Sequence, residues 1–169
     1  MPAVAADRIV AAPGTRTGSI GVVGGKIANV AHELQKERGM SAGYLGSKGV
    51  KFVGELPGQR GESDRAIAAL DSGLADFDAG AYGDTLARNL TEARARLGEL
   101  NTMREAISNL AVAPSEAVGY YSGSIGTLLS ITGQLATLEQ LRPGQTRLSN
   151  GLRAPAAAVR LENNELVVV

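Results

Sequence analysis

Two arginines interrupt the apolar stripes of predicted helices, and their positions demand a chemical explanation. Arg38 follows Leu34 by four residues and Arg104 follows Leu100 by four, so each falls on a face that its helix should turn toward the core. A guanidinium keeps its proton, and burying it without a partner costs on the order of several kcal/mol. Each arginine therefore needs a carboxylate, a set of carbonyl groups or a bound anion.

Two explanations of these arginines stay open from the residues alone. In the first, both form ordinary ion pairs with neighbouring carboxylates, for which Glu37, Asp64, Glu99, Glu105 and Glu116 are available. In the second, the two cations meet hydroxyl donors and helix N-termini around a small anion. The expected anion site then comprises Arg38, Arg104, Ser41 and Tyr121, with Glu37, Asp64 and Tyr44 in supporting or salt-bridging positions.

The composition excludes several classes of function. Among 169 residues, 17 basic and 17 acidic side chains cancel, so no net field favours nucleic acid. The chain has no cysteine and a single histidine, His32, which excludes cysteine nucleophiles and metal sites built from several imidazoles. Glu33 and Glu37 lack the Glu-x-x-His partner of a di-metal site. We therefore expect neither an enzyme nor a metal or cofactor.

Apolar residues recur in steps of three and four in four segments, which predicts four helices. The stripes run from Ile27 to Leu45, from Ser63 or Asp64 to Phe77, from Leu86 to Ile107, and from Val118 to Leu135. Pro114 is typical of a helix start, and Pro143 is expected to follow the end of the last helix. The short breaks between the segments favour helices that alternate in direction.

The expected fold is therefore all-α, an antiparallel (up-down) four-helix bundle over residues 25–141. Residues 1–24, rich in Ala, Gly, Pro and Thr, predict a flexible N-terminal segment. Residues 142–169 predict an irregular tail that adds at most a short strand. No run reaches the roughly 18 apolar residues that span a bilayer, and the N-terminus lacks the apolar core of a signal peptide. We therefore expect a soluble chain; the sequence favours the cytoplasm over the periplasm but leaves the compartment open.

The segment "ELQKERGMSAGYL" (33–45) closely resembles the signature of the NIT domain, the nitrate- and nitrite-sensing domain of bacterial receptors. That signature reads Leu-Gln-x-Glu-Arg-Gly-x-Ser-Ala-x-Tyr-Leu. Three later segments are similar to other family elements, in the same order and at compatible spacings: "LPGQRGESDRAIAAL" (56–70), "LGELNTMREAI" (97–107) and "SEAVGYYSGSIGTLLSI" (115–131). The resemblance covers residues 27–140.

The resemblance implies a non-catalytic, all-helical sensor that binds nitrate or nitrite and signals to an output such as a histidine kinase. The family's ligand arginine falls on Arg38, and Gln35 of the same motif supports it. A complete NIT domain has a second set of helices that supplies another anion-contacting arginine, and this sequence diverges after residue 141. We expect Arg104 to replace that arginine, or a second copy or a separate signalling chain to complete the domain.

Two further points stay open at this stage. The alternative function is a helical dimerisation module with the same fold and no anion binding. Sensor domains of the family lie in the periplasm in many members, whereas nothing in this sequence directs export.

Overall fold

The computed structural model describes residues 17–151, 159–162 and 165–168, and the side chains of residues 20–141. In chain order the elements are α1 (Thr17–Gly46), α2 (Glu55–Leu74), the 3-10 helix η2 (Ala79–Tyr82), α3 (Asp84–Gly98), α4 (Leu100–Ser108), α5 (Pro114–Gly151), β1 (Val159–Glu162) and β2 (Glu165–Val168). The predicted all-α class is confirmed for the body of the chain, to which β1 and β2 add a two-stranded antiparallel hairpin.

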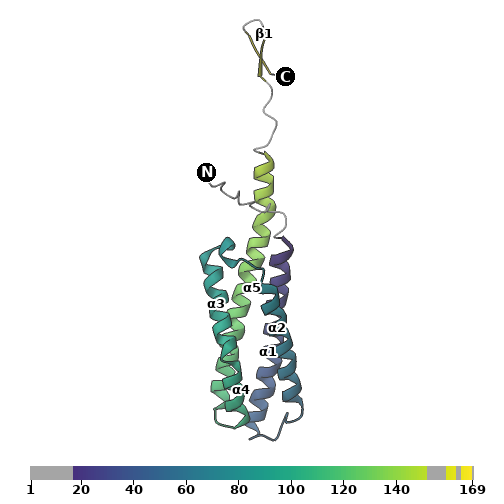
Figure 1. Ribbon diagram of the computed structural model, residues 1–169. Helices are drawn as coiled ribbons and strands as arrows, with labels where there is room; N and C mark the ends of the chain where they lie inside the picture. The colour runs from purple at the N-terminus through teal and green to yellow at the C-terminus, as the bar shows by residue number, and fades with distance from the viewer. Residues whose placement is uncertain (1–16, 152–158, 163–164, 169) are drawn as a thin grey trace, which may run out of the picture.

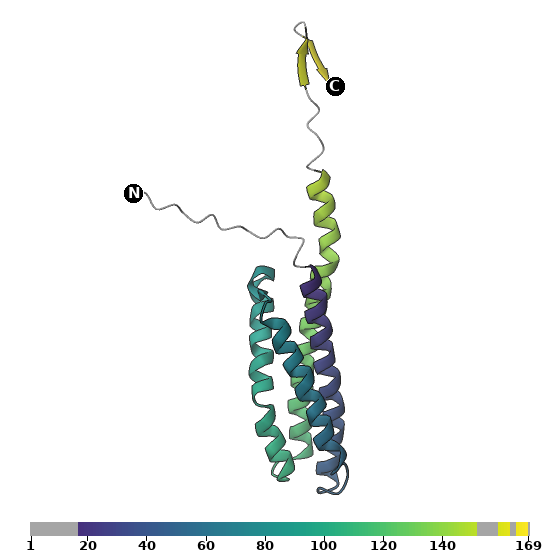
Figure 2. The ribbon, with the colours of Figure 1, turned by 45° about the vertical axis from the view of Figure 1, so that its right-hand side comes forward.

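The helices lie side by side along one axis (Figure 1). Both views show the chain passing down α1, up α2, down through α3 and α4, and up α5, which continues beyond the ends of the other helices (Figures 1 and 2). The most extensive packing joins α1 to α5 and to α2, and α5 also packs against α3. α1 and α5 are therefore the pair whose relative position most affects the bundle.

The core consists of small and aliphatic side chains, as the low aromatic content predicts. Tyr121 is the largest side chain that is completely buried. The aliphatic residues with almost no exposure include Ile27, Val30, Leu34, Ile107, Leu128 and Ile131. Polar residues interrupt this core in the last third of α1, where Glu37 and Ser41 are also buried.

The first and last helices are both longer than predicted. α1 begins at Thr17, inside the segment expected to be flexible, because Ile20 and Val23 continue the apolar stripe and are buried. α5 ends at Gly151 and passes through Pro143, where the helix was expected to have stopped. A proline removes one hydrogen bond of a helix and can bend it, but the residues around it can stay helical.

The second and third helices also differ from the prediction at their ends. α2 begins at Glu55, so part of the expected loop is helical; Pro57 lies in the first turn, where backbone N–H groups have no helical partner to lose. The third predicted helix is interrupted at Glu99 and forms α3 and α4. Its apolar stripe continues across the interruption, because Leu90, Leu100 and Ile107 are all buried.

Candidate functional site

A buried ion pair joins α4 to α1 in the interior of the bundle, toward the end at which α4 lies (Figure 1). The Arg104 side chain is 7% exposed and the Glu37 side chain is 0% exposed. Arg104 Nε donates to Glu37 Oε1 at 2.7 Å, and Arg104 Nη2 donates to Glu37 Oε2 at 2.9 Å. The two parallel bonds form the bidentate arrangement in which a guanidinium and a carboxylate bind most strongly.

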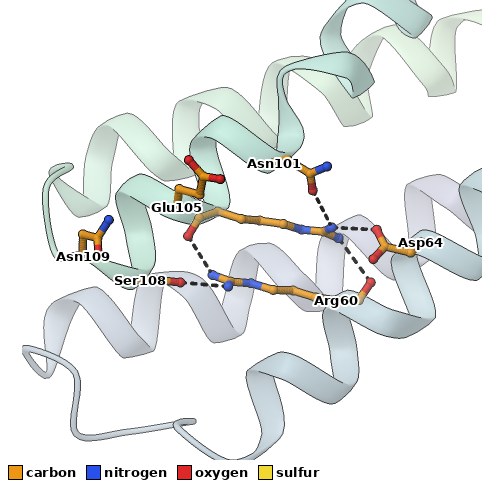
Figure 3. Close-up of a pocket in the computed structure, with 7 residues that line it drawn as sticks. Arg60, Asp64, Asn101, Glu105, Ser108 and Asn109 are labelled. Carbon is orange, nitrogen blue, oxygen red and sulfur yellow. Dashed lines mark hydrogen bonds and ion pairs between the residues drawn. The ribbon is translucent and has the colours of Figure 1, made fainter.

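The remaining donors of Arg104 are also occupied (Figure 3). Its Nη1 donates to Asp64 Oδ1 at 2.6 Å and to Asn101 Oδ1 at 3.3 Å, and its Nη2 donates to the Arg60 carbonyl at 3.2 Å. A guanidinium has five N–H donors, and all five of these meet protein acceptors. The ion-pair explanation therefore holds for Arg104, which has no donor left for an anion in this arrangement.

Tyr121 brings α5 into the same cluster. Its hydroxyl donates to Glu37 Oε1 at 2.8 Å. Burial and the negative charge of Glu37 raise the pKa of Tyr121, so the phenol stays protonated and remains a donor. Burial alone would raise the pKa of Glu37, but the Arg104 guanidinium and the hydroxyls of Ser63 and Tyr121 hold it below its ordinary value. Glu37 is therefore a buried carboxylate anion at neutral pH.

Ser41 lies one helical turn after Glu37 on α1 and is 1% exposed. Within the described part of the chain, its hydroxyl has no partner that meets hydrogen-bond geometry. It lowers the pKa of the Tyr121 phenol, against the larger effect of burial. Ser41 is therefore a buried hydroxyl one turn from the carboxylate that Tyr121 binds.

Arg38 is not in the apolar seam, and this prediction was wrong. The structure places Glu37 in the seam and leaves Arg38 half-buried on the flank of α1. A helix has 3.6 residues per turn, so the positions three and four residues after Leu34 lie almost equally close to its face. Glu37 takes the inner position because Arg104 and Tyr121 supply partners for it there.

The Arg38 guanidinium faces α5, where its Nη1 donates to Ser122 Oγ at 3.1 Å. Glu37 and Asp64, its expected carboxylate partners, are both bound to Arg104. Within the described residues Arg38 forms no ion pair, and Ser122 is its one hydrogen-bond partner there. Arg38 is thus a half-buried cation with donors available and no counter-ion.

The other predicted site residues divide into two groups. Glu37, Ser41, Arg104 and Tyr121 lie together in the buried cluster, and the exposed Asp64 binds Arg104 at its edge. Gln35 and Tyr44 lie outside that cluster: Gln35 is exposed, and the Tyr44 hydroxyl donates to the Ser108 carbonyl at 3.3 Å. The structure therefore brings five of the predicted residues together, but it places Arg38 on the half-buried flank of α1, beside the cluster and not in it.

Sequence reasoning missed Ser122, Asn101 and Arg60. Arg60 Nη2 donates to the Arg104 carbonyl at 3.2 Å while Arg104 donates to the Arg60 carbonyl, so the two side chains lie along each other in opposite directions (Figure 3). They line a shallow, open pocket of about 460 Å³ between α2 and α4. The signal in the sequence that could have indicated such partners was Arg104 itself, since a guanidinium predicted in the core requires several hydrogen-bond acceptors around it.

In the part of the chain that the structure describes, no group of three or more His, Cys, Asp or Glu side chains could hold a metal ion. None of the helices in that part of the chain is both long and apolar enough to cross a membrane.

The comparison with protein families decides the identity of this bundle. The profile of the NIT family, described as nitrate and nitrite sensing, matches residues 29–161. The chain belongs to the NIT family. The predicted resemblance is confirmed, and the family match extends beyond residue 140, where the recognised motifs end.

The chain is also similar to a solved structure. The structure of the NasR transcription antiterminator is similar to this chain with a TM-score of 0.66 and 27% sequence identity. The match covers 72% of this chain and 33% of the NasR chain, so the chain spans about a third of NasR. No curated protein matches the chain.

Proposed function

We propose that this NIT chain binds nitrate or nitrite through Arg38 and passes the state of that site to a partner module. The observation that carries the proposal is that Arg38 is half-buried and has no carboxylate partner among the described residues, although it lies in the motif that defines the family resemblance. A bound anion would supply the missing counter-charge.

The chemistry of the guanidinium suits a small planar oxyanion. One Arg38 nitrogen is engaged by Ser122, which leaves an edge of the guanidinium for two parallel N–H···O bonds. Nitrate and nitrite each present two oxygens in one plane, as a carboxylate does. Ser122 adds a hydroxyl beside the same position. Arg104, Ser41 and Tyr121 support the geometry from the cluster rather than contact the anion, because Arg104 has no spare donor.

The partner that we favour is a second copy of this chain, lying against the outer face of α1 and α5. From Ala117 to Leu138 α5 carries no charged residue. Its exposed positions in register with Ser122 are Gly119, Gly126, Leu129 and Gly133. A solvent-facing helix surface normally carries charges, and small residues permit close helix approach. In a dimer across this face, the two copies would bring two Arg38 side chains to one interface.

The same uncharged face favours a second candidate function, a dimerisation module that binds no anion. Such a module would dimerise with an association constant that nitrate and nitrite do not change. A protein–protein contact of this kind needs no counter-charge at Arg38, whereas the sensor proposal does.

Titration calorimetry with nitrate, nitrite and chloride tests the sensor proposal. We expect heat with nitrate or nitrite that exceeds any heat with chloride. Arg38→Ala should abolish it, and Arg38→Lys should weaken binding about tenfold or more, because an ammonium lacks the planar fork. Arg94→Ala is the matched control, since Arg94 is an exposed arginine paired with Asp71 on the bundle surface. Nitrate binding that survives Arg38→Ala would contradict the proposal.

A further inference from the structure

Two consecutive residues of α1 contact two consecutive residues of α5. Glu37 accepts a hydrogen bond from Tyr121 inside the bundle, and Arg38 donates one to Ser122 at the flank. The two contacts are held by the same short piece of backbone on each helix. A movement that breaks one of them therefore displaces the other.

Glu37 is fixed to the rest of the bundle on its other side. Arg104 holds its carboxylate by two bonds and at the same time binds Asp64 and the Arg60 carbonyl of α2. α1, α2 and α4 are thus joined by several charge-assisted bonds, which are the stronger kind. α5 enters this cluster through the single Tyr121 hydroxyl. Among α1, α2, α4 and α5, the helices that meet in the cluster, α5 can therefore move while breaking the fewest of the cluster's hydrogen bonds.

Ser41 provides an alternative partner for that hydroxyl. It is buried and, within the described residues, has no partner of hydrogen-bond geometry, and it lies one turn of α1 after Glu37, the acceptor of the Tyr121 hydroxyl. An unpaired buried hydroxyl costs free energy that a completed bond would recover. A small displacement of α5 along α1 would exchange the Glu37 bond of Tyr121 for a bond to Ser41, so the cluster has two arrangements available.

We propose that Glu37, Tyr121 and Ser41 couple the occupancy of Arg38 to the position of α5. An anion that draws Arg38 away from Ser122 removes the flank contact, and α5 shifts until the Tyr121 hydroxyl leaves Glu37 and binds Ser41. The three are positioning residues, because they act on Arg38 through the helix pair. This inference rests on the proposed function and adds the helix that carries the signal. α5 is suited to this role because it continues beyond the other helices (Figures 1 and 2).

Electron–electron double resonance on the full chain tests the coupling. The chain has no cysteine, so Lys36→Cys on α1 and Gln140→Cys on α5 place one spin label on an exposed position of each helix. Labelled protein is diluted with unlabelled chain so that only distances within one chain are measured. We expect saturating nitrate to change the distance between the labels, and Tyr121→Phe and Ser41→Ala each to reduce that change to less than half.

Tyr120→Phe is the matched control. Tyr120 is the neighbouring residue of α5, and its hydroxyl donates to the Arg96 carbonyl of α3 instead of to the cluster. We expect it to show the full change in distance. Nitrate heat with no distance change, or a full change in both Tyr121→Phe and Ser41→Ala, would overturn the coupling alone. Absence of nitrate and nitrite heat in the wild type would overturn the proposed function and the coupling with it.

Discussion

Glu37 accepts hydrogen bonds from two other helices while its side chain is fully buried. Arg104 and Tyr121 together provide three donors to the two carboxylate oxygens. A buried ion pair is a weak source of net stability, because both charges have been removed from water. Removing only one partner is strongly destabilising, since the other charge then stays buried without compensation. At the scale of single residues, the cluster is therefore sensitive to unbalanced changes.

Arg104→Met should destabilise the bundle by about 3–5 kcal/mol, because it leaves the Glu37 carboxylate buried without a counter-charge. Urea unfolding followed by circular dichroism measures this loss. Glu37→Met combined with Arg104→Met should recover much of it. Asp64→Asn is the control: the Asp64 side chain is 59% exposed, so its loss should cost less than about 1 kcal/mol. Equal losses for Arg104→Met and Asp64→Asn would contradict the buried-charge account.

The stability of the bundle should fall in acid. The pKa of Glu37 in the folded chain lies below its ordinary value of 4.5, so the unfolded chain binds protons more readily. The stabilisation from Glu37 is complete above pH 4.5 and is lost as the pH falls through the lower folded-state pKa. We expect the free energy of unfolding, measured between pH 3 and 7, to decrease less with falling pH in Glu37→Gln than in the wild type. In Glu33→Gln, which changes a carboxylate outside the cluster, most of the wild-type decrease should remain.

At the scale of elements, the sequence predicted the inner face of the third helix well and that of the first poorly. Arg104 is buried on the predicted stripe because apolar residues precede and follow it at consistent steps. On α1 the steps after Leu34 allowed either Glu37 or Arg38 to face inward, and periodicity does not separate three from four residues. The choice depends on partners from α4 and α5, which are distant in sequence. The predicted helix ends were wrong because each proline was taken to lie outside a helix: Pro57 lies in the first turn of α2, where no helical hydrogen bond is lost, and α5 continues through Pro143.

Two glycines of α1 should respond in opposite ways to alanine. A Cβ at Gly39 would meet nothing within 4 Å, so Gly39→Ala should stabilise the helix by about 1 kcal/mol. A Cβ at Gly43 would lie 2.4 Å from Phe52 Cε2, which forces the ring to move and cancels the gain. Urea unfolding should show Gly43→Ala stabilising only when combined with Phe52→Ala. A full stabilisation by Gly43→Ala alone would show that the ring moves without cost.

At the scale of the whole molecule, the family and the helical class followed from the sequence, because four motifs in order are specific. The composition of the cluster did not follow, since Arg60, Asn101 and Ser122 have no periodic signal of their own. The surface proposed for association is also a property of the whole molecule: the outer face of α5 is uncharged from Ala117 to Leu138.

Association of two copies should depend on Leu129 and on nitrate together. Leu129 lies seven residues, or two turns, after Ser122 on the same face of α5 and is 48% exposed. Leu129→Lys should weaken dimerisation in sedimentation equilibrium while leaving the urea midpoint of the bundle nearly unchanged, because an exposed lysine costs the fold little. Val53→Lys is the control, since Val53 is 57% exposed in the loop between α1 and α2, away from this face.

If two Arg38 side chains meet at the interface, nitrate reduces their repulsion, and the dimerisation constant should rise about 5–150-fold, the usual range for coupled sites. The rise should disappear in Arg38→Ala, whereas a dimer that forms equally well with and without nitrate would favour the anion-independent dimerisation module.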